Sequence, residues 1–220
     1  MPNTDPTVPG RDADDDAQLM ARTARGDSGA FEALVHRHQR RVFSLVYRSV
    51  GNVPDAEDLV QEVFLRVYRA ADRYRPTARF TTWLYRVTAN VVINWLRRHR
   101  RHPVELARVV GREDGEENSR ALTDPTAETG LDAITRDEAR AQVRAAVAAL
   151  PPNQRLAVLL FRFEGLSYQE IAETLACSVM AVKSLLSRAR ENLRDRLAPY
   201  VSEEAGFSWK HSTPDPRSTE

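Results

Sequence analysis

The feature that most constrains the fold is a pair of closely spaced helix starts between Gly165 and Arg196. Ser167 and Glu170 form a capping box, which predicts the start of a short helix. Ser178 is a second N-cap residue and predicts the start of a longer one. Apolar residues then recur at helical spacing, namely Val182, Leu185, Leu186, Ala189 and Leu193. The stretch therefore predicts a helix-turn-helix.

The other face of the longer helix is polar and cationic. It carries Lys183, Ser184, Ser187, Arg188 and Arg190. Such side chains bond phosphates and base edges when a helix enters the major groove of DNA. An ordinary helical hairpin with a solvated cationic face is the alternative. The compact succession of cap, turn and cap favours duplex DNA as a partner.

Composition excludes several classes of function. The single cysteine, Cys177, rules out an intramolecular disulfide framework and fits a reducing, cytoplasmic location. The N-terminus has no signal-peptide pattern, and no apolar run approaches the ~18 residues of a membrane span, so we expect no membrane insertion. One cysteine and five scattered histidines cannot supply a closed metal shell, so neither a metal nor another cofactor is expected.

Helical periodicity without convincing strand alternation predicts an all-α fold with two small helical domains. The predicted segments are a disordered N-terminal extension (1–16), a first helical domain (17–101), a flexible acidic linker (102–131), a second helical domain (132–198) and a disordered tail (199–220). The net charge of +1 hides a change of sign along the chain, which is more informative than the total.

A helix expected from about Val53 to Ala71 is acidic on one side. Asp55, Asp58 and Glu62 recur at i, i+3 and i+7, beside Gln61. One interpretation is an ordinary solvated helix face, in which the acids are stabilised by the positive N-terminal end of the helix dipole. The functional reading is a docking surface for a basic protein partner, since such a surface repels DNA.

The next predicted helix has the opposite sign, with arginines and no acidic residue between Arg79 and Pro103. One stripe of this helix mixes aromatic, amide and guanidinium groups: Trp83, Arg86, Asn90, Asn94 and Arg97. Tyr74 and Phe80 add aromatic rings just before it. These groups stack on bases and bind phosphates, which indicates single-stranded DNA as a target. The alternative is that Phe80 and Trp83 are core anchors.

Three segments together resemble bacterial sigma factors of the extracytoplasmic-function class, group IV of the sigma-70 family. They are DAEDLVQEVFLRVY at 55–68, FTTWLYRVTANVVINWLRR at 80–98 and ALPPNQRLAVLLFRFEGLSYQEIAETLACSVMAVKSLLSRAR at 149–190. The resemblance implies sigma domains 2 and 4 in a non-enzymatic subunit that binds core RNA polymerase, recognises the minus-thirty-five and minus-ten promoter elements and assists melting. It also implies contact with the β flap of the polymerase, a stress or envelope regulon and an inhibitory anti-sigma factor.

The resemblance also implies residue roles. The surface for the clamp coiled coil of the β′ subunit would include Asp55, Asp58, Gln61, Glu62 and Phe64. The minus-ten element, with its exposed non-template strand and an everted base, would be held by Tyr74, Phe80, Trp83, Arg86, Asn90, Asn94, Arg97 and Arg98. The minus-thirty-five element would be read by Ser178, Lys183, Ser184, Ser187, Arg188 and Arg190.

Two positions depart from the pattern of that class. Asn94 stands where many members carry Asp, and Leu185 stands where many carry a basic residue. The second change removes an expected phosphate or base contact, so the minus-thirty-five preference is expected to differ from that of relatives.

Two other functions were weighed. A repressor or activator acting through the helix-turn-helix alone would leave the acidic and arginine-rich helices without a task. An enzyme acting on nucleic acid, such as a recombinase, would need a nucleophile or a metal-binding carboxylate cluster within 17–101. Asp55, Glu57 and Asp58 are the only crowded acids there and make a poor metal site.

Overall fold

Helices account for all the regular structure in the described part of the chain, which in this computed structural model comprises residues 11–76, 79–99 and 130–200. The elements are α1 (Arg11–Thr23), α2 (Ser28–Val50), α3 (Val53–Arg69), η1 (Ala71–Arg73), α4 (Phe80–His99), α6 (Gly130–Ala148), α7 (Pro152–Arg162), α8 (Tyr168–Leu175), α9 (Val179–Leu197) and η3 (Ala198–Tyr200). The predicted all-α fold class is confirmed.

Helices α1 to α4 form the first group. The Asp27 side chain caps α2 by accepting a hydrogen bond from the Ala30 amide at 3.0 Å. Gly51 ends α2 with φ of 89°, a left-handed conformation that glycine adopts without strain. Asn52 then caps α3. This sharp junction turns α3 back along α2, so that their apolar faces share one core.

The N-terminal helix starts earlier than the sequence predicts. Helix α1 begins at Arg11, inside the stretch 1–16 that was expected to be disordered. Its anchor is a buried ion-pair network, in which Asp16 accepts from Arg37 at 2.6 Å and lies 2.9 Å from His38 Nε2. Asp15 pairs with the same arginine at 2.8 Å. These partners lie on α2, so the local composition of residues 1–16 does not reveal them.

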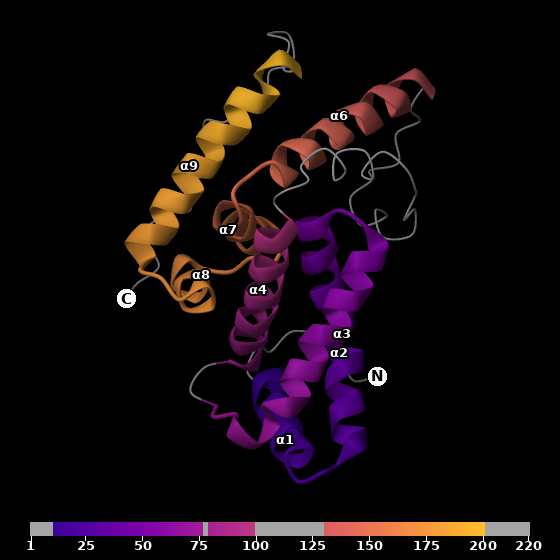
Figure 1. Cartoon of the computed structure of the whole chain (residues 1–220), viewed down its shortest axis with the longest axis vertical. Coiled ribbons are helices and arrows are strands. Elements are labelled where there is room, and N and C mark those ends of the chain that lie inside the picture. Colours follow the sequence, from indigo (N-terminus) through magenta and orange to yellow (C-terminus); the bar gives the residue numbers. More distant parts are fainter. Residues whose placement is uncertain (1–10, 77–78, 100–129, 201–220) are drawn as a thin grey trace, which may run out of the picture.

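Helices α6 to α9 form the second group. Leu156, Leu159 and Leu160 of α7 are buried and belong to the same hydrophobic cluster as Ile171 of α8 and Val182 of α9. The described part of α6 is mostly exposed along its length and packs against α9 and α2. Figure 1 shows α6 and α9 as the two long arms of this group.

The two groups pack against each other through α4, which lies between α7 and α8 on one side and α2 and α3 on the other (Figure 1). Phe80, Leu84 and Val91 form one buried side of α4. Tyr85, Ala89, Val92 and Leu96, at i, i+4, i+7 and i+11, form a second buried side. We call this second set the inner stripe of α4.

Among the described residues, hydrogen bonds and a cation–π contact join the two groups across this interface. The Tyr85 hydroxyl donates to Glu164 at 2.5 Å, from the inner stripe to the segment between α7 and α8. The buried Arg155 of α7 donates to the Ser49 carbonyl oxygen of α2 at 2.5 Å. The Arg48 guanidinium lies 4.3 Å from the centre of the Phe163 ring. The groups predicted as separate domains therefore share a specific interface.

The predicted linker, 102–131, lies outside the described residues except for the first residues of α6. The predicted tail is described only as far as η3. Within the described ranges, none of the helices combines the length and apolar character that crossing a membrane requires.

Candidate nucleic-acid and protein interfaces

The acidic face of α3, defined by Asp55, Asp58, Gln61 and Glu62, is on the surface as predicted. Its charges are not equivalent. Glu62 pairs with Arg66 one turn further along the helix at 2.5 Å, and Asp55 accepts from the Asn52 side chain at 2.6 Å. Asp58 is exposed and has no ion pair within the described residues. Asp58 is therefore the least neutralised carboxylate of this face.

The apolar part of this face differs from the sequence expectation. Phe64 is only 7% exposed and points into the core, whereas Leu65 is 53% exposed and Tyr68 is 50% exposed. Leu65 lies at i+3 from Glu62 and i+4 from Gln61, and therefore adjoins the C-terminal end of the acidic face. Sequence reasoning missed both residues, although the combination of helical spacing and an apolar residue among acids could have identified Leu65.

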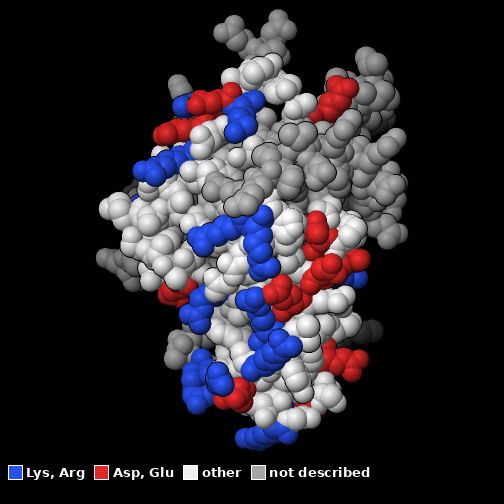
Figure 2. All heavy atoms as spheres, in the orientation of Figure 1, with Lys and Arg blue, Asp and Glu red and all other residues white. Residues whose placement is uncertain are grey.

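Helix α4 presents the mixed polar stripe to solvent. Arg86, Asn90, Asn94 and Arg97 are exposed and lie on one side of the helix, with Arg98 also exposed. We call these four residues the amide–arginine face. Figure 2 shows basic side chains down the middle and lower part of the visible surface, with acidic side chains grouped beside them. On this face of the molecule, basic and acidic side chains therefore lie next to one another.

Three aromatic rings pack together at the start of α4. Tyr74 lies 5.0 Å from Trp83 and 5.9 Å from Phe80, and Phe80 lies 5.7 Å from Trp83, measured between ring centres. Phe80 is 2% exposed, so its ring cannot stack on a base without a structural change. Tyr74 and Trp83 are half-buried and keep an accessible edge. Phe80 is thus a core anchor, which was the alternative considered for it.

A hollow of about 270 Å³ opens next to Tyr74. It is lined by Ala17, Ala21, Ala24, Arg25, Ala71, Asp72, Tyr74, Arg75 and Pro76. The Tyr74 hydroxyl is buried and makes no hydrogen bond within the described residues. Burial, with a smaller contribution from the charge of Asp16, raises the pKa of this hydroxyl above its usual value, so Tyr74 is neutral and able to donate.

The aromatic cluster rests on the ion-pair network that anchors α1. The ring of His38 lies 5.2 Å from that of Phe80, and His38 is itself held by Asp16. From the sequence, no role was expected for His38 and no metal site was expected from the histidines. Among the described residues, no three His, Cys, Asp or Glu side chains are grouped closely enough to bind a metal ion. In this structure His38 instead packs against the Phe80 ring.

The helix-turn-helix prediction is confirmed in detail. The Ser167 amide donates to Glu170 Oε2 at 2.9 Å, and the Glu170 amide donates back to Ser167 Oγ at 3.3 Å, which completes the capping box of α8. Ser178 caps α9 by accepting from the Ala181 amide at 3.1 Å. The five residues of the polar face of α9, Lys183, Ser184, Ser187, Arg188 and Arg190, are all exposed.

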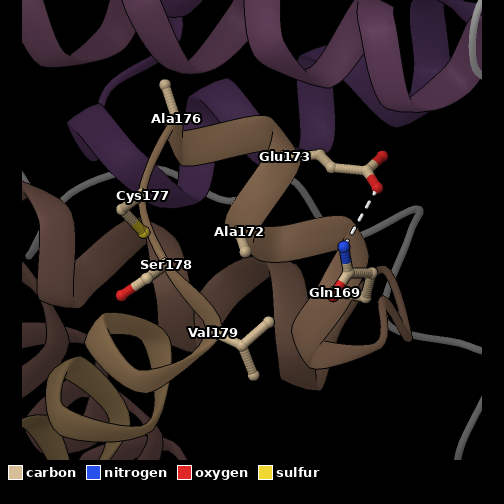
Figure 3. Close-up of a pocket in the computed structure, with 7 residues that line it drawn as sticks. All are labelled: Gln169, Ala172, Glu173, Ala176, Cys177, Ser178 and Val179. Atoms are coloured by element: carbon tan, nitrogen blue, oxygen red, sulfur yellow. Dashed lines mark hydrogen bonds between the residues drawn. The ribbon is translucent and has the colours of Figure 1, made fainter.

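An open hollow of about 570 Å³ lies at the elbow between α8 and α9 (Figure 3). It is lined by Gln169, Ala172, Glu173, Ala176, Cys177, Ser178 and Val179. Ala176 turns the chain with φ of 50°, a left-handed conformation uncommon for a residue with a Cβ. Burial raises the pKa of the Cys177 thiol, so the cysteine behaves as a small packing residue here rather than as a reactive thiolate.

The position that departs from the family pattern in α9 is part of the core boundary. Leu185 is half-buried and packs against the hydrophobic cluster that includes Val182 and Leu186. Its side chain therefore adds packing to the second group of helices. Asn94, the other departure, is exposed within the amide–arginine face.

Comparison with known proteins assigns both groups of helices. The family described as Sigma-70 region 2 matches residues 34–102, and the family described as Sigma-70, region 4 matches residues 140–193. The RNA polymerase sigma-H factor of Pseudomonas aeruginosa is 39% identical over 190 residues, which cover 86% of this chain and 96% of the relative. The ECF RNA polymerase sigma-E factor of Escherichia coli is 37% identical over 188 residues, covering 84% and 96%.

Solved structures show a related arrangement of helices. The structure of CnrH in complex with the cytosolic domain of CnrY matches with a TM-score of 0.58 and 27% identity, and covers 85% of this chain and 99% of that one. The sigma factor RpoE from Bartonella quintana, solved with the anti-sigma factor NepR, matches with a TM-score of 0.53 and 21% identity, and covers 76% and 96%. At that identity the second match indicates the fold alone.

The two family matches lie in the order that a two-domain sigma factor requires, and the relatives match over nearly their whole length. Neither a stand-alone regulator nor a nucleic-acid enzyme accounts for both matches. This chain therefore belongs to the sigma-70 family, as a sigma factor of the extracytoplasmic-function class that initiates transcription and is not an enzyme.

Proposed function

We propose that three exposed helix faces divide the work of promoter recognition in this sigma factor. The acidic face of α3 binds core RNA polymerase, the amide–arginine face of α4 holds melted minus-ten DNA, and the polar face of α9 reads the minus-thirty-five duplex. The supporting observation is the contrast between α3, with surface acids followed by an exposed apolar residue, and α4, which exposes arginine and asparagine. A polyanion is repelled by the first face and attracted by the second.

The surface of α3 fits a basic helical partner with an apolar seam, such as the clamp coiled coil of the β′ subunit. Leu65 and Tyr68 supply apolar area that a partner can cover, and Asp58 and Glu62 supply negative charge on its N-terminal side. An apolar centre with a charged rim is the usual composition of a protein interface. Phe64 contributes from beneath, by holding α3 on the core.

The start of α4 fits melted DNA. Asn90 and Asn94 offer amide groups to base edges, while Arg86 and Arg97 neutralise phosphates. The hollow beside Tyr74, with its unpaired hydroxyl, is a candidate pocket for an everted base of the non-template strand. Extruding a base costs a few kcal/mol, which stacking on Tyr74 and Trp83 would offset.

The second group of helices binds the minus-thirty-five duplex. Helix α9 stands at the edge of the molecule (Figure 1), with Lys183 and Arg190 exposed for phosphates and Ser184 and Ser187 for base edges. The same group is the expected site for the β flap.

An inhibitory protein is a further expected partner. CnrH was solved with the cytosolic domain of CnrY. By analogy, we propose that an inhibitory anti-sigma protein also binds this chain.

The division of labour can be tested with a charge reversal in the full-length protein. Asp58→Lys should weaken binding to purified core RNA polymerase by at least about tenfold, because it places a like charge opposite a basic partner. Glu138→Lys is the matched control, since Glu138 is an exposed acid on α6. Run-off transcription on a promoter library should give the same promoter preference for both variants at saturating protein.

The outcomes separate the roles. Asn90→Ala should leave the affinity for core polymerase unchanged and weaken binding of the holoenzyme to single-stranded minus-ten oligonucleotides. If Asp58→Lys instead changed promoter preference at unchanged core affinity, the assignment of α3 to polymerase would be wrong. Failure of the wild-type protein to initiate on any template would overturn the proposal as a whole.

A further inference from the structure

Met180 is the most exposed large apolar side chain in the described part of the chain, at 73%. It lies in the first turn of α9, two positions after the N-cap Ser178. The Ser178 hydroxyl accepts from the Ala181 amide, so the backbone on either side of Met180 is fixed. An exposed thioether contributes nothing to the core, which makes this position a candidate for contact with another molecule.

Helical spacing places Met180 among the residues proposed to face DNA. Met180, Lys183, Ser184 and Ser187 stand at i, i+3, i+4 and i+7, and all four are exposed. The buried side of the same helix is formed by Val182, Leu186 and Ala189. A partner that covers Lys183 and Ser184 therefore also covers Met180.

The position of Met180 at the N-terminal end of α9 favours contact with the bases rather than with the phosphates. In a helix-turn-helix the N-terminal residues of the second helix reach the base edges in the major groove. Met180 occupies that end of α9 and directly follows Ser178 and Val179, which line the open hollow at the elbow (Figure 3). Lys183 and Ser187, one and two turns further along, are placed for polar contacts.

In the major groove, one chemical group of the bases is suited to contact with an apolar side chain such as that of Met180. The C5-methyl of thymine is the apolar feature that distinguishes one base in the major groove, and apolar side chains contact it. Methionine is long, unbranched and polarizable, so it can adapt its shape to a methyl group. We propose that Met180 is a specificity-determining residue that contacts the methyl group of a thymine in the minus-thirty-five duplex. This inference rests on the proposed role of α9 in duplex reading.

The test removes only the C5-methyl group of thymine from the DNA and leaves the rest of the base unchanged. Once the duplex element has been mapped with holoenzyme on a promoter library, each of its thymines is replaced in turn by deoxyuridine. Uracil at one position should weaken binding of the wild-type holoenzyme about fourfold, the effect of one buried methyl group. Holoenzyme with Met180→Ala should bind the thymine duplex more weakly and lose nothing further at that position. Met180→Leu, which keeps an apolar side chain, should retain the sensitivity to uracil.

The controls separate this inference from the proposed function of α9. Lys183→Ala should weaken binding to every duplex and keep the uracil effect. If Lys183→Ala behaves this way while Met180→Ala still responds to uracil like the wild type, or if the wild type responds at no thymine, Met180 does not read a methyl group. If neither variant changes duplex affinity, the assignment of α9 to the duplex fails instead. Met180 is exposed and alanine favours helix, so the variant should fold.

Discussion

At the scale of single residues, Leu65 shows how one side chain can define a surface. It exposes about half of its area one turn after the last acidic residue of α3, while its neighbour Phe64 is buried. Exposed leucine is unremarkable by itself, but here it adjoins the half-exposed ring of Tyr68. A partner that covered both would gain apolar burial at the centre of its contact.

Leu65→Ala should weaken the affinity for core RNA polymerase by about 1 to 2 kcal/mol, the value expected for a partly buried leucine at an interface. Stability should change little, because the side chain is half exposed in the free protein. Val143→Ala is a matched control, since Val143 on α6 is 47% exposed. Titration of labelled core polymerase measures both variants. Equal affinities for Leu65→Ala and wild type would place the polymerase contact elsewhere.

At the scale of elements, helix starts are set by individual caps with their own chemistry. Asp27 caps α2, and the hydrogen bond from the Ala30 amide is the main cause that lowers its pKa, followed by the contact with Arg22. A carboxyl group with a lowered pKa in the folded state stabilises the fold above its ordinary pKa. That contribution is lost as the pH falls through the lowered value.

Asp27→Asn should therefore unfold at a lower temperature than the wild type near neutral pH, because asparagine carries no negative charge to pair with Arg22. Asparagine is still a good cap, so the helix should form in both proteins. The difference in melting temperature should shrink as the pH falls below about 4, the ordinary value for aspartate. Circular dichroism melts across acidic pH measure it, and a constant difference would show that the charge of Asp27 does not matter.

At the scale of the whole molecule, a few polar contacts join the two sigma regions. Burial, and then the hydrogen bond to Glu164, raise the pKa of Tyr85 well above its usual value. Linkage gives the sign of the pH dependence. The stabilisation is complete below the ordinary tyrosine pKa of about 10 and is lost as the pH rises through the raised value. The packed arrangement should hence be present at neutral pH and should weaken in alkali.

Tyr85→Phe removes the hydroxyl group and should cost about 1.5 to 3 kcal/mol, the range for a hydrogen bond to a charged group. The population of separated regions should rise by at least about tenfold, seen as a larger radius of gyration in small-angle X-ray scattering. Tyr200→Phe is the control, because Tyr200 is 60% exposed. If Tyr85→Phe and wild type scatter identically at neutral pH and in alkali, this hydrogen bond does not hold the regions together.

The sequence predicted what depends on neighbouring residues and missed what depends on distant ones. The starts of α8 and α9 were predictable because Ser167, Glu170 and Ser178 form their capping hydrogen bonds within one turn of the helix. Periodicity identified which residues share a face of α3, but Phe64 and Leu65 are adjacent and both apolar, so only the packing of α3 on its neighbours decides which is buried.

Long-range partners were equally invisible in the sequence. Nothing local pairs Asp16 with His38, or Tyr85 with Glu164, because each pair is brought together only by the tertiary fold. The interface between the two regions was missed for the same reason. Its members were individually unremarkable positions on helices whose existence had been predicted.

The central position of α4 also has a consequence for biosynthesis. Its contacts with α2 and α3 can form before its contacts with α7 and α8, because α7 and α8 are synthesised later. Helices α1 to α4 precede α7 and α8 along the chain, so they are synthesised first. At ~5–20 residues per second, roughly 4 to 15 seconds separate completion of α4 from completion of α8. During that interval the part of α4 that packs against α7 and α8 has neither helix to cover it. A nascent chain is thus most exposed to aggregation or capture by a chaperone while the second half is being translated.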